Sequence, residues 1–96
     1  MKIILLGSAE NDLKDGFFFY EKQKKGLGAY FLESLMSDID SLILFAGIHS
    51  IHFDSYHRLL SKRFPFAIYY QVENEETKIY AVVDCRRDPE WLKSRF

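Results

Sequence analysis

The hydrophobic spacing changes from a helical to a strand-like period near Gly47, and that change restricts which folds the chain can adopt. Before Gly47, apolar residues recur every three or four positions, as on the buried face of a helix; Phe31, Leu35 and Ile39 form the clearest run. After Gly47, short β-branched and aromatic runs separated by turn residues are typical of strands. The sequence therefore predicts an α+β domain with its helices ahead of most of its sheet.

Boundary residues place the predicted elements. Lys2 to Leu6 is predicted to be an N-terminal strand, and a helix follows from Ser8, as its N-cap, to about Lys25. A link of two or three residues leads to a second helix from Leu27 to Gly47, so the two should form an antiparallel helical hairpin. Three further strands should form an antiparallel meander that completes a small sheet: His57–Lys62, Pro65–Val72 and Thr77–Asp84, with a turn at Asn74-Glu75-Glu76 and a short C-terminal tail or helix after Pro89. Residues 48–56 are ambiguous.

Composition excludes several classes of protein. With 96 residues the chain is predicted to be a single domain over residues 1–96. Thirteen basic and fourteen acidic residues give a net charge of −1, which argues against coating nucleic acid by charge alone, and we expect no sequence-specific DNA binding. The single cysteine, Cys85, cannot form an internal disulfide, and the first residues lack a signal peptide or membrane helix, so we expect a cytoplasmic location without membrane contact.

Four aromatic residues stand in a row in the first predicted helix, from Phe17 to Tyr20. Each points about 100° around the helix from the one before, so one sheet cannot cover all four. Phe17 and Tyr20 are predicted to share the buried face with Leu13, whereas Phe18 and Phe19 point away from it. Those two either pack under a terminus, a loop or the second helix, or form a surface for a partner.

Three histidines, His49, His52 and His57, lie close together in the sequence, as zinc ligands often do. No cysteine pair accompanies them, so we expect solvated or hydrogen-bonded histidines and no metal site. Cys85 and His57 would act together as a thiol nucleophile only if the fold placed them side by side, and nothing in the sequence does so. There is no glycine-rich phosphate loop, and we predict no cofactor.

Arginine and aromatic residues gather in the second half of the chain. This combination suits RNA, through phosphate contacts and base stacking, and it equally suits an acidic protein partner. A solvated charged face is the alternative, since Asp84, Asp88 and Glu90 are interleaved. The residues concerned are Arg58, Lys62, Arg63, Arg86, Arg87, Lys93 and Arg95, with Tyr69, Tyr70, Tyr80 and Trp91.

Several motifs in order along the chain resemble the RelE/ParE family of bacterial type II toxins. They are Tyr20-Glu21, Gly26-Leu27-Gly28 with Phe31, the stretch from Tyr56 through Phe64-Pro65-Phe66-Ala67-Ile68-Tyr69-Tyr70, Ile79–Val83, and Arg86-Arg87-Asp88-Pro89 with Trp91. The resemblance implies the same strand, helical hairpin and meander order. It also implies a toxin that is neutralised by an antitoxin wrapped around it.

The family holds two activities, and the resemblance separates them by residue. RelE-like members are ribosome-dependent ribonucleases that cut mRNA with basic and aromatic side chains, whereas ParE-like members poison DNA gyrase and need no catalytic set. Here Ala67 stands where the nuclease branch carries an arginine, Asp84 where a histidine is common and Phe66 where a tyrosine is common, and Trp91 lies near a usual tyrosine. These departures favour the ParE-like branch, which would not be an enzyme. Because the RelE-like alternative would be an endoribonuclease, the question of enzyme activity stays open.

The resemblance yields two sets of candidate residues. For binding an antitoxin or a target, they are Phe18, Phe19, Arg86, Arg87, Trp91 and Arg95. For mRNA cleavage, the alternative function, they are Arg58, Arg63, Arg86, Arg87 and Trp91. A third alternative is a protein that has lost toxicity and still binds its antitoxin, which Ala67 and Asp84 would explain.

Overall fold

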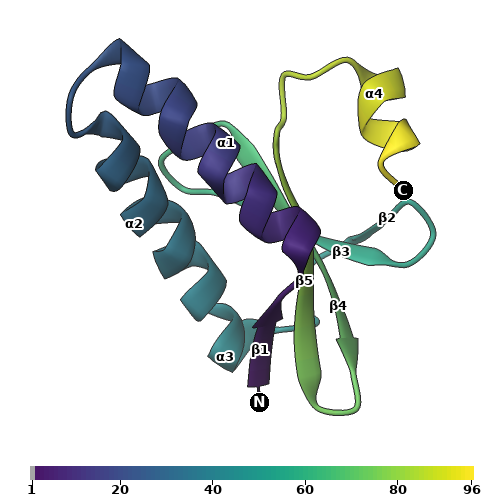
Figure 1. Cartoon of the computed structure of the whole chain (residues 1–96). Helices are drawn as coiled ribbons and strands as arrows, with labels where there is room; N and C mark the ends of the chain where they lie inside the picture. Colours follow the sequence, from purple (N-terminus) through teal and green to yellow (C-terminus); the bar gives the residue numbers. More distant parts are fainter. Residues whose placement is uncertain (1) are drawn as a thin grey trace.

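The computed structural model describes residues 2–96, and it consists of one mixed sheet with helices packed against it (Figure 1). The elements in chain order are β1 (Lys2–Leu5), α1 (Gly7–Gln23), α2 (Leu27–Asp40), α3 (Leu42–Phe45), β2 (Ile51–His52), β3 (Tyr56–Leu60), β4 (Phe66–Glu73), β5 (Glu76–Asp84) and α4 (Pro89–Ser94). The strand order is β1-β5-β4-β3-β2, with β1 parallel to β5 and the other pairs antiparallel. The predicted α+β fold, with a helical hairpin ahead of an antiparallel meander, is confirmed.

Some predicted boundaries are wrong, for local reasons. The second predicted helix is two: α2 ends at Asp40 and α3 begins at Leu42. Between them the Ser41 hydroxyl donates to the Asp38 carbonyl at 2.6 Å, a contact that competes with the helical hydrogen-bond ladder. Ser8 is not the N-cap of α1, because Leu6 holds that position and the Ser8 hydroxyl instead donates to the Tyr80 carbonyl at 2.6 Å.

The ambiguous stretch, residues 48–56, contains β2 and a tight turn into β3. Phe53 and Asp54 form that turn with φ of 51° and 72°, and Asn74 and Glu75 form the β4–β5 turn with φ of 52° and 61°. Two successive left-handed residues match the right-handed twist of the strands they join, so both hairpins turn tightly.

The described residues contain no helix long and apolar enough to cross a membrane.

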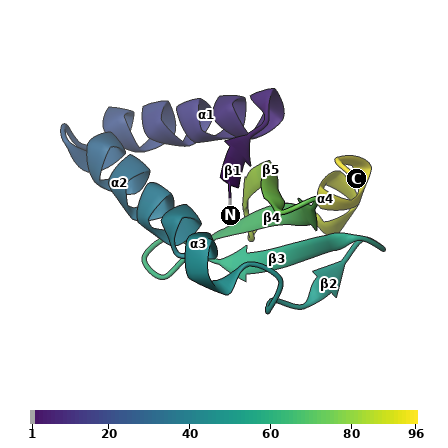
Figure 2. The ribbon, with the colours of Figure 1, turned by 90° about the horizontal axis from the view of Figure 1, so that it is seen from below.

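The sheet separates two apolar clusters. The larger lies under the helical hairpin, which covers one face of the sheet (Figure 2). Alternate residues of β4 point to the other face, where Ala67 and Tyr69 pack with residues that follow β5. The larger cluster consists of Ala9, Leu13, Tyr20, Phe31, Leu35, Ile39, Leu42, Phe66, Ile68, Tyr70, Ile79 and Val82. The C-terminal region is therefore held by a separate cluster.

The row of rings on α1 divides differently from the prediction. Tyr20 is buried as predicted, but Phe17 is only half-buried, and Gly16 takes its place on the packed face. Phe18 and Phe19 are 58% and 53% exposed, so the reading in which they pack under another element is wrong. Two adjacent rings therefore stand on the solvent side of α1.

Glycine lets α1 and α2 approach closely. A Cβ at Gly28 would lie 2.6 Å from the Phe17 carbonyl oxygen, and one at Gly16 would lie 2.5 Å from the Phe31 ring. At the start of α2, the Glu21 carboxylate accepts hydrogen bonds from the backbone N–H groups of Gly26 and Gly28, at 3.0 and 2.9 Å. Gly26, with φ of 91°, makes the left-handed turn that this arrangement requires.

Replacing Gly28 with alanine should separate the two helices. The added methyl group meets backbone, which cannot move aside, so we expect the free energy of unfolding to fall by about 1–3 kcal/mol. Gly7→Ala is the matched control, because a Cβ there meets nothing within 4 Å and alanine favours a helix. Urea unfolding of both variants checks this, and an equal effect of the two substitutions would contradict it.

A histidine–tyrosine cluster holds the segment between α3 and β2 against the sheet. The buried Tyr70 hydroxyl accepts from the Gly47 N–H at 3.0 Å and is hydrogen-bonded to His49 Nδ1. His57 stacks on the Tyr70 ring, and its Nδ1–H donates to the His49 carbonyl at 2.7 Å. Two of the three histidines are thus hydrogen-bonded parts of the fold, and His52 Nε2 lies 3.0 Å from the Ser50 hydroxyl.

Stability should depend on pH between about 8 and 5 because of His49. Desolvation, with a smaller effect of nearby His57, lowers the pKa of His49 below its ordinary value of about 6.5. The unfolded chain therefore binds the proton more readily, so the free energy of unfolding is unaffected above that range and falls as pH drops through about 6.5. Thermal unfolding of wild type and His49→Asn checks this: the loss of melting temperature toward pH 5 should be smaller in the variant.

Candidate functional site

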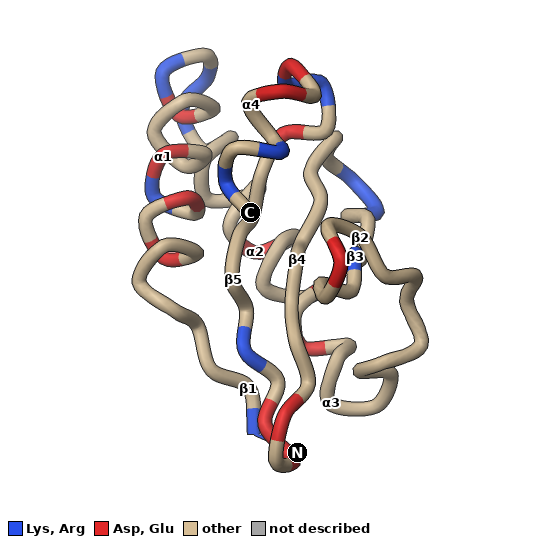
Figure 3. Tube along the Cα trace, turned by 90° about the vertical axis from the view of Figure 1, so that its right-hand side faces the viewer, with Lys and Arg blue, Asp and Glu red and all other residues tan. Residues whose placement is uncertain are grey.

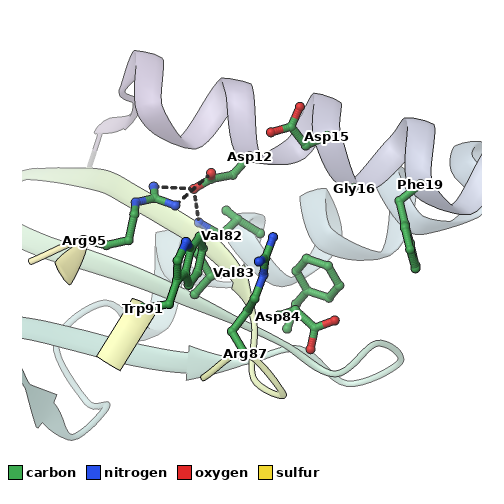
Figure 4. A pocket seen from close by; sticks show the side chains of 11 residues that line it. Asp12, Asp15, Gly16, Phe19, Val82, Val83, Asp84, Arg87, Trp91 and Arg95 are labelled. Atoms are coloured by element: carbon green, nitrogen blue, oxygen red, sulfur yellow. Dashed lines mark hydrogen bonds and ion pairs between the residues drawn. The ribbon is translucent and has the colours of Figure 1, made fainter. Parts of the chain in front are cut away.

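A groove of about 490 Å³ lies between α1 and the region that follows β5 (Figure 4). It exists because β1 is short: its last residue, Leu5, is paired with Ile79, so β5 has no strand neighbour on that side beyond Ile79. The α1 helix passes over this edge of β5, and α4 closes the other side. The lining residues are Asp12, Asp15, Gly16, Phe19, Phe66, Val82, Val83, Asp84, Arg87, Trp91 and Arg95.

The Asp12 carboxylate connects the two walls of the groove. Its Oδ2 accepts from the Val82 N–H on the open edge of β5, at 2.9 Å. Arg95 binds both carboxylate oxygens, at 3.2 and 2.9 Å, from a position 83 residues further along the chain (Figure 4). One side chain therefore replaces a missing strand partner and fixes the C-terminal region to α1. The charge of Arg95, a predicted binding residue, is neutralised by this pair.

A second set of contacts holds the C-terminal region on the face of the sheet away from α1 and α2. Phe96 stacks on Phe53 with ring centroids 4.5 Å apart, and it also contacts Tyr56, Tyr69 and Tyr80. The Tyr80 hydroxyl donates to the Arg95 carbonyl at 3.1 Å. Tyr80 reaches this face because the register shifts between Tyr69 and Tyr70, which leaves Tyr80 as the extra residue of a β-bulge.

Arg86 forms an ion pair with Asp84. Its guanidinium donates to both carboxylate oxygens, at 3.0 and 2.7 Å, and its backbone N–H donates to Oδ1 at 2.8 Å. The hydrogen bond from the Arg86 side chain holds the pKa of Asp84 below its ordinary value. Burial raises the pKa of Tyr20, and Arg86 beside it opposes that rise. The Asp84 carboxylate therefore pairs with the positive charge of Arg86, so the Arg86 guanidinium is less available to a phosphate than the sequence predicts.

Arg87 is the more accessible cation in the groove. Its guanidinium lies 4.3 Å above the centre of the Trp91 ring, and Arg95 lies 5.6 Å from the same ring. Within residues 2–96, Arg87 makes no ion pair, and its side chain is exposed. Acidic and basic residues are interspersed around α4 (Figure 3), so the charge of the site is mixed and not strongly basic.

The fold brings some predicted residues together and separates others. Phe19, Arg87, Trp91 and Arg95 line the groove, and Phe18 lies next to it in a shallow hollow with Phe19 and Lys22. Arg58 is on β3 opposite Tyr69, and Arg63 is exposed in the β3–β4 turn; neither lines the groove. The set predicted for mRNA cleavage, Arg58, Arg63, Arg86, Arg87 and Trp91, does not share one cavity in the described residues.

Sequence reasoning missed Asp12, Asp15, Gly16 and Val82 as parts of the groove. Asp12 carries a sequence signal only for a favourable charge near the start of a helix. Its partner Arg95 is at the other end of the chain, and no local pattern connects the two. The backbone N–H that Asp12 accepts from becomes available only where β1 stops, which depends on tertiary pairing.

Cys85 and the histidines do not form a reactive site. His57 lies opposite Tyr70 on β4, whereas Cys85 donates its backbone N–H to the Pro65 carbonyl. Pro65 and Tyr70 are five positions apart, or roughly 17 Å along the strand, so His57 and Cys85 lie far from each other. Cys85 is exposed, yet desolvation raises the pKa of its thiol, so it is not an activated thiolate. No group of three or more potential metal ligands is found in residues 2–96.

Removing the Asp12 carboxylate should destabilise the fold more than removing Arg95. Asp12→Ala leaves the Val82 N–H without a partner and also frees Arg95, so we expect a loss of about 2 kcal/mol. Arg95→Ala keeps the Val82 bond and should cost about 1 kcal/mol or less, since the pair is partly solvated. Asp15→Ala, an exposed groove residue, is the control and should stay within about 0.5 kcal/mol.

Equilibrium unfolding in urea measures these differences, and the double variant Asp12→Ala/Arg95→Ala measures the coupling between the two side chains. The double variant should lose less than the sum of the single losses, because the ion pair is counted twice in that sum. Additive losses would show that the pair contributes nothing to stability.

No family model matches the sequence, and no curated protein matches it. The structure is similar to a chain of the solved structure described as the chromosomal ParDE TA system from P. aeruginosa, with a TM-score of 0.81 and 16% sequence identity. The match covers 88% of this chain and 95% of that one. At this identity the likeness establishes the fold, and it supports the ParE-like architecture that the sequence resemblance implies.

Proposed function

We propose that this protein is the toxin component of a bacterial type II toxin–antitoxin system, acting in the cytoplasm and neutralised by a cognate antitoxin. The observation that carries the proposal is the fold match to a chain of the ParDE system over nearly the full length of both chains. The family motifs named in the sequence support it, because they fall on the parts that build this fold. Gly26 makes the left-handed turn between α1 and α2, Gly28 allows the two helices to approach closely, and residues 64–70 include the first half of the central strand β4.

Inhibition of a macromolecular target, with DNA gyrase favoured, fits the sheet better than nuclease chemistry does. Ala67, at the position where the nuclease branch has an arginine, is 1% exposed and packed in the second cluster. The same face is filled by the Phe96 ring contacts, so it offers rings packed on one another instead of an open cradle for a phosphate. Arg86 is held by Asp84. A toxin that works by binding alone requires none of these groups to be free.

The groove and the adjoining rings are the proposed binding surface. Arginine and large aromatic residues, tryptophan above all, carry much of the binding energy at protein interfaces. Arg87, Trp91 and Phe19 bring such residues together in the groove. Phe18 extends this surface along α1. We propose that the antitoxin covers Phe18, Phe19 and Arg87, which would also keep the target away from them.

Loss of the Arg87 guanidinium or the Trp91 ring should weaken the toxin. We expect Arg87→Ala and Trp91→Ala each to weaken binding of the antitoxin by about tenfold or more and to reduce growth arrest when expressed alone. Lys24→Ala, an exposed cation in the α1–α2 link, is the matched control and should behave as wild type. Titration calorimetry with the antitoxin and colony counts after induction are the measurements; wild-type behaviour of both site variants would contradict the proposal.

The target is identified by two assays on the same purified protein. The first assay measures supercoiling of plasmid DNA by gyrase. Inhibition by a stoichiometric amount of the toxin supports the ParE-like proposal. Primer extension on ribosome-bound mRNA tests the alternative, for which the Arg87–Trp91 stack is the supporting observation, since such a pair can hold a phosphate and a base. Growth arrest on expression without antitoxin excludes the non-toxic alternative, and its absence excludes both toxin readings.

A further inference from the structure

An uncharged apolar surface lies on the segment from α3 to β2, away from the groove. The run from Ser41 to Phe53 contains no Asp, Glu, Lys or Arg in thirteen residues, on a chain in which 28% of residues are charged. Within it Leu44 is 80% and Ile48 71% exposed, and Ile43, Phe45 and Ile51 are each about half exposed. We call these five residues the α3–β2 surface. About half or more of each of these side chains is exposed, and nothing in the proposed toxin site uses them.

The outer edge of β2 adjoins this surface and is open to another strand. β2 is the last strand of the sheet, so within residues 2–96 no strand lies beyond it. Ile51 is paired with His57, and the neighbouring bond from Arg58 N–H to the Ser50 carbonyl is 3.0 Å. In an antiparallel ladder this makes Ile51 a non-hydrogen-bonded position with respect to β3. The N–H and C=O of Ile51 therefore point outward, toward the open edge.

We propose that a second copy of this chain docks on the α3–β2 surface across a two-fold axis next to Ile51. Antiparallel pairing of β2 with its symmetry mate lets each Ile51 N–H donate to the other Ile51 C=O, so the contact is complementary to itself. The axis is perpendicular to the sheet, so the helices of both copies lie on the same face of the combined sheet. The two Ile51 side chains then lie opposite each other across the axis.

The absence of charge favours a second copy over any other occupant. Across a two-fold axis each residue faces itself or a neighbour of itself, so a charged surface would place like charges opposite each other, and this one does not. It equally gives nothing for a charged peptide to pair with, unlike the groove at Arg87. An exposed strand edge without Lys or Pro is also a site where strands of separate chains pair.

The area fits a weak dimer. The five residues together expose on the order of 500 Å², near the upper end of single apolar patches on monomers. A standard interface buries about 800 Å² per partner, and the flanking backbone of β2 and the loop before it can supply the rest. We therefore expect dissociation in the range of about 1–100 µM, with two backbone hydrogen bonds fixing the register.

Sedimentation velocity of the purified chain from about 1 to 500 µM tests the proposal. We expect wild type to pass from monomer to dimer over this range, and Ile51→Lys and Ile51→Glu each to weaken dimerisation by tenfold or more. An equimolar mixture of these two variants should recover the dimer at low salt, because opposite charges then meet at the axis. The recovery is specific to an interface in which position 51 meets itself, and a general loss of folding cannot produce it.

Leu60→Lys is the matched control, since Leu60 is 53% exposed, close to the 51% of Ile51, and lies on β3 with its side chain on the other face. It should dimerise as wild type does. Circular dichroism and melting temperature check that the position 51 variants are folded. Wild type that stays monomeric throughout would overturn the proposal, as would a dimer that the Ile51 substitutions leave unchanged or a mixture that fails to recover while both variants are folded.

Discussion

The carboxylate of Asp12 is the contact on which the rest of this structure depends. It joins three parts of the chain that have no other common element: the first helix, the exposed end of the last strand and the C-terminal region. A strand as short as β1 would leave β5 with unsatisfied backbone groups beyond Ile79. Ser8 and Asp12 supply side-chain partners there, to the Tyr80 carbonyl and the Val82 N–H. The helix can therefore cross an open sheet edge without exposing it, and the groove is the space that this crossing leaves.

The same arrangement explains how a protein with net charge −1 presents one accessible arginine beside the groove that is unpaired within the described residues. Two of its three arginines near the groove are paired, Arg86 with Asp84 and Arg95 with Asp12, and they serve the fold. Arg87 is left to stack on Trp91. Pairing the neighbours directs attraction to one place, which suits recognition of a single partner better than a broad basic patch would.

Sequence reasoning reached the fold because the fold is written in local patterns. The helical spacing before Gly47, the apolar and aromatic run in residues 66–70 and the Asn74 turn each act over a few residues and agree with one another. The site could be predicted only as a list of exposed candidates, since residues such as Asp12 and Arg95 meet through tertiary pairing. Phe17 and Gly16 show the limit within one helix: spacing alone places a ring on the packed face, whereas the approach of Phe31 requires a residue without a side chain there.

The parallel pairing of β1 with β5 has a consequence for synthesis on the ribosome. Lys2 is paired with Glu76, so the first strand to emerge has no partner until most of the chain has been made. The helical hairpin can close on its own, but the apolar face that it presents to the sheet stays uncovered until β4 and β5 appear. Completion of the fold is thus delayed until β5 has been made, which leaves a period in which the apolar face of the hairpin is exposed.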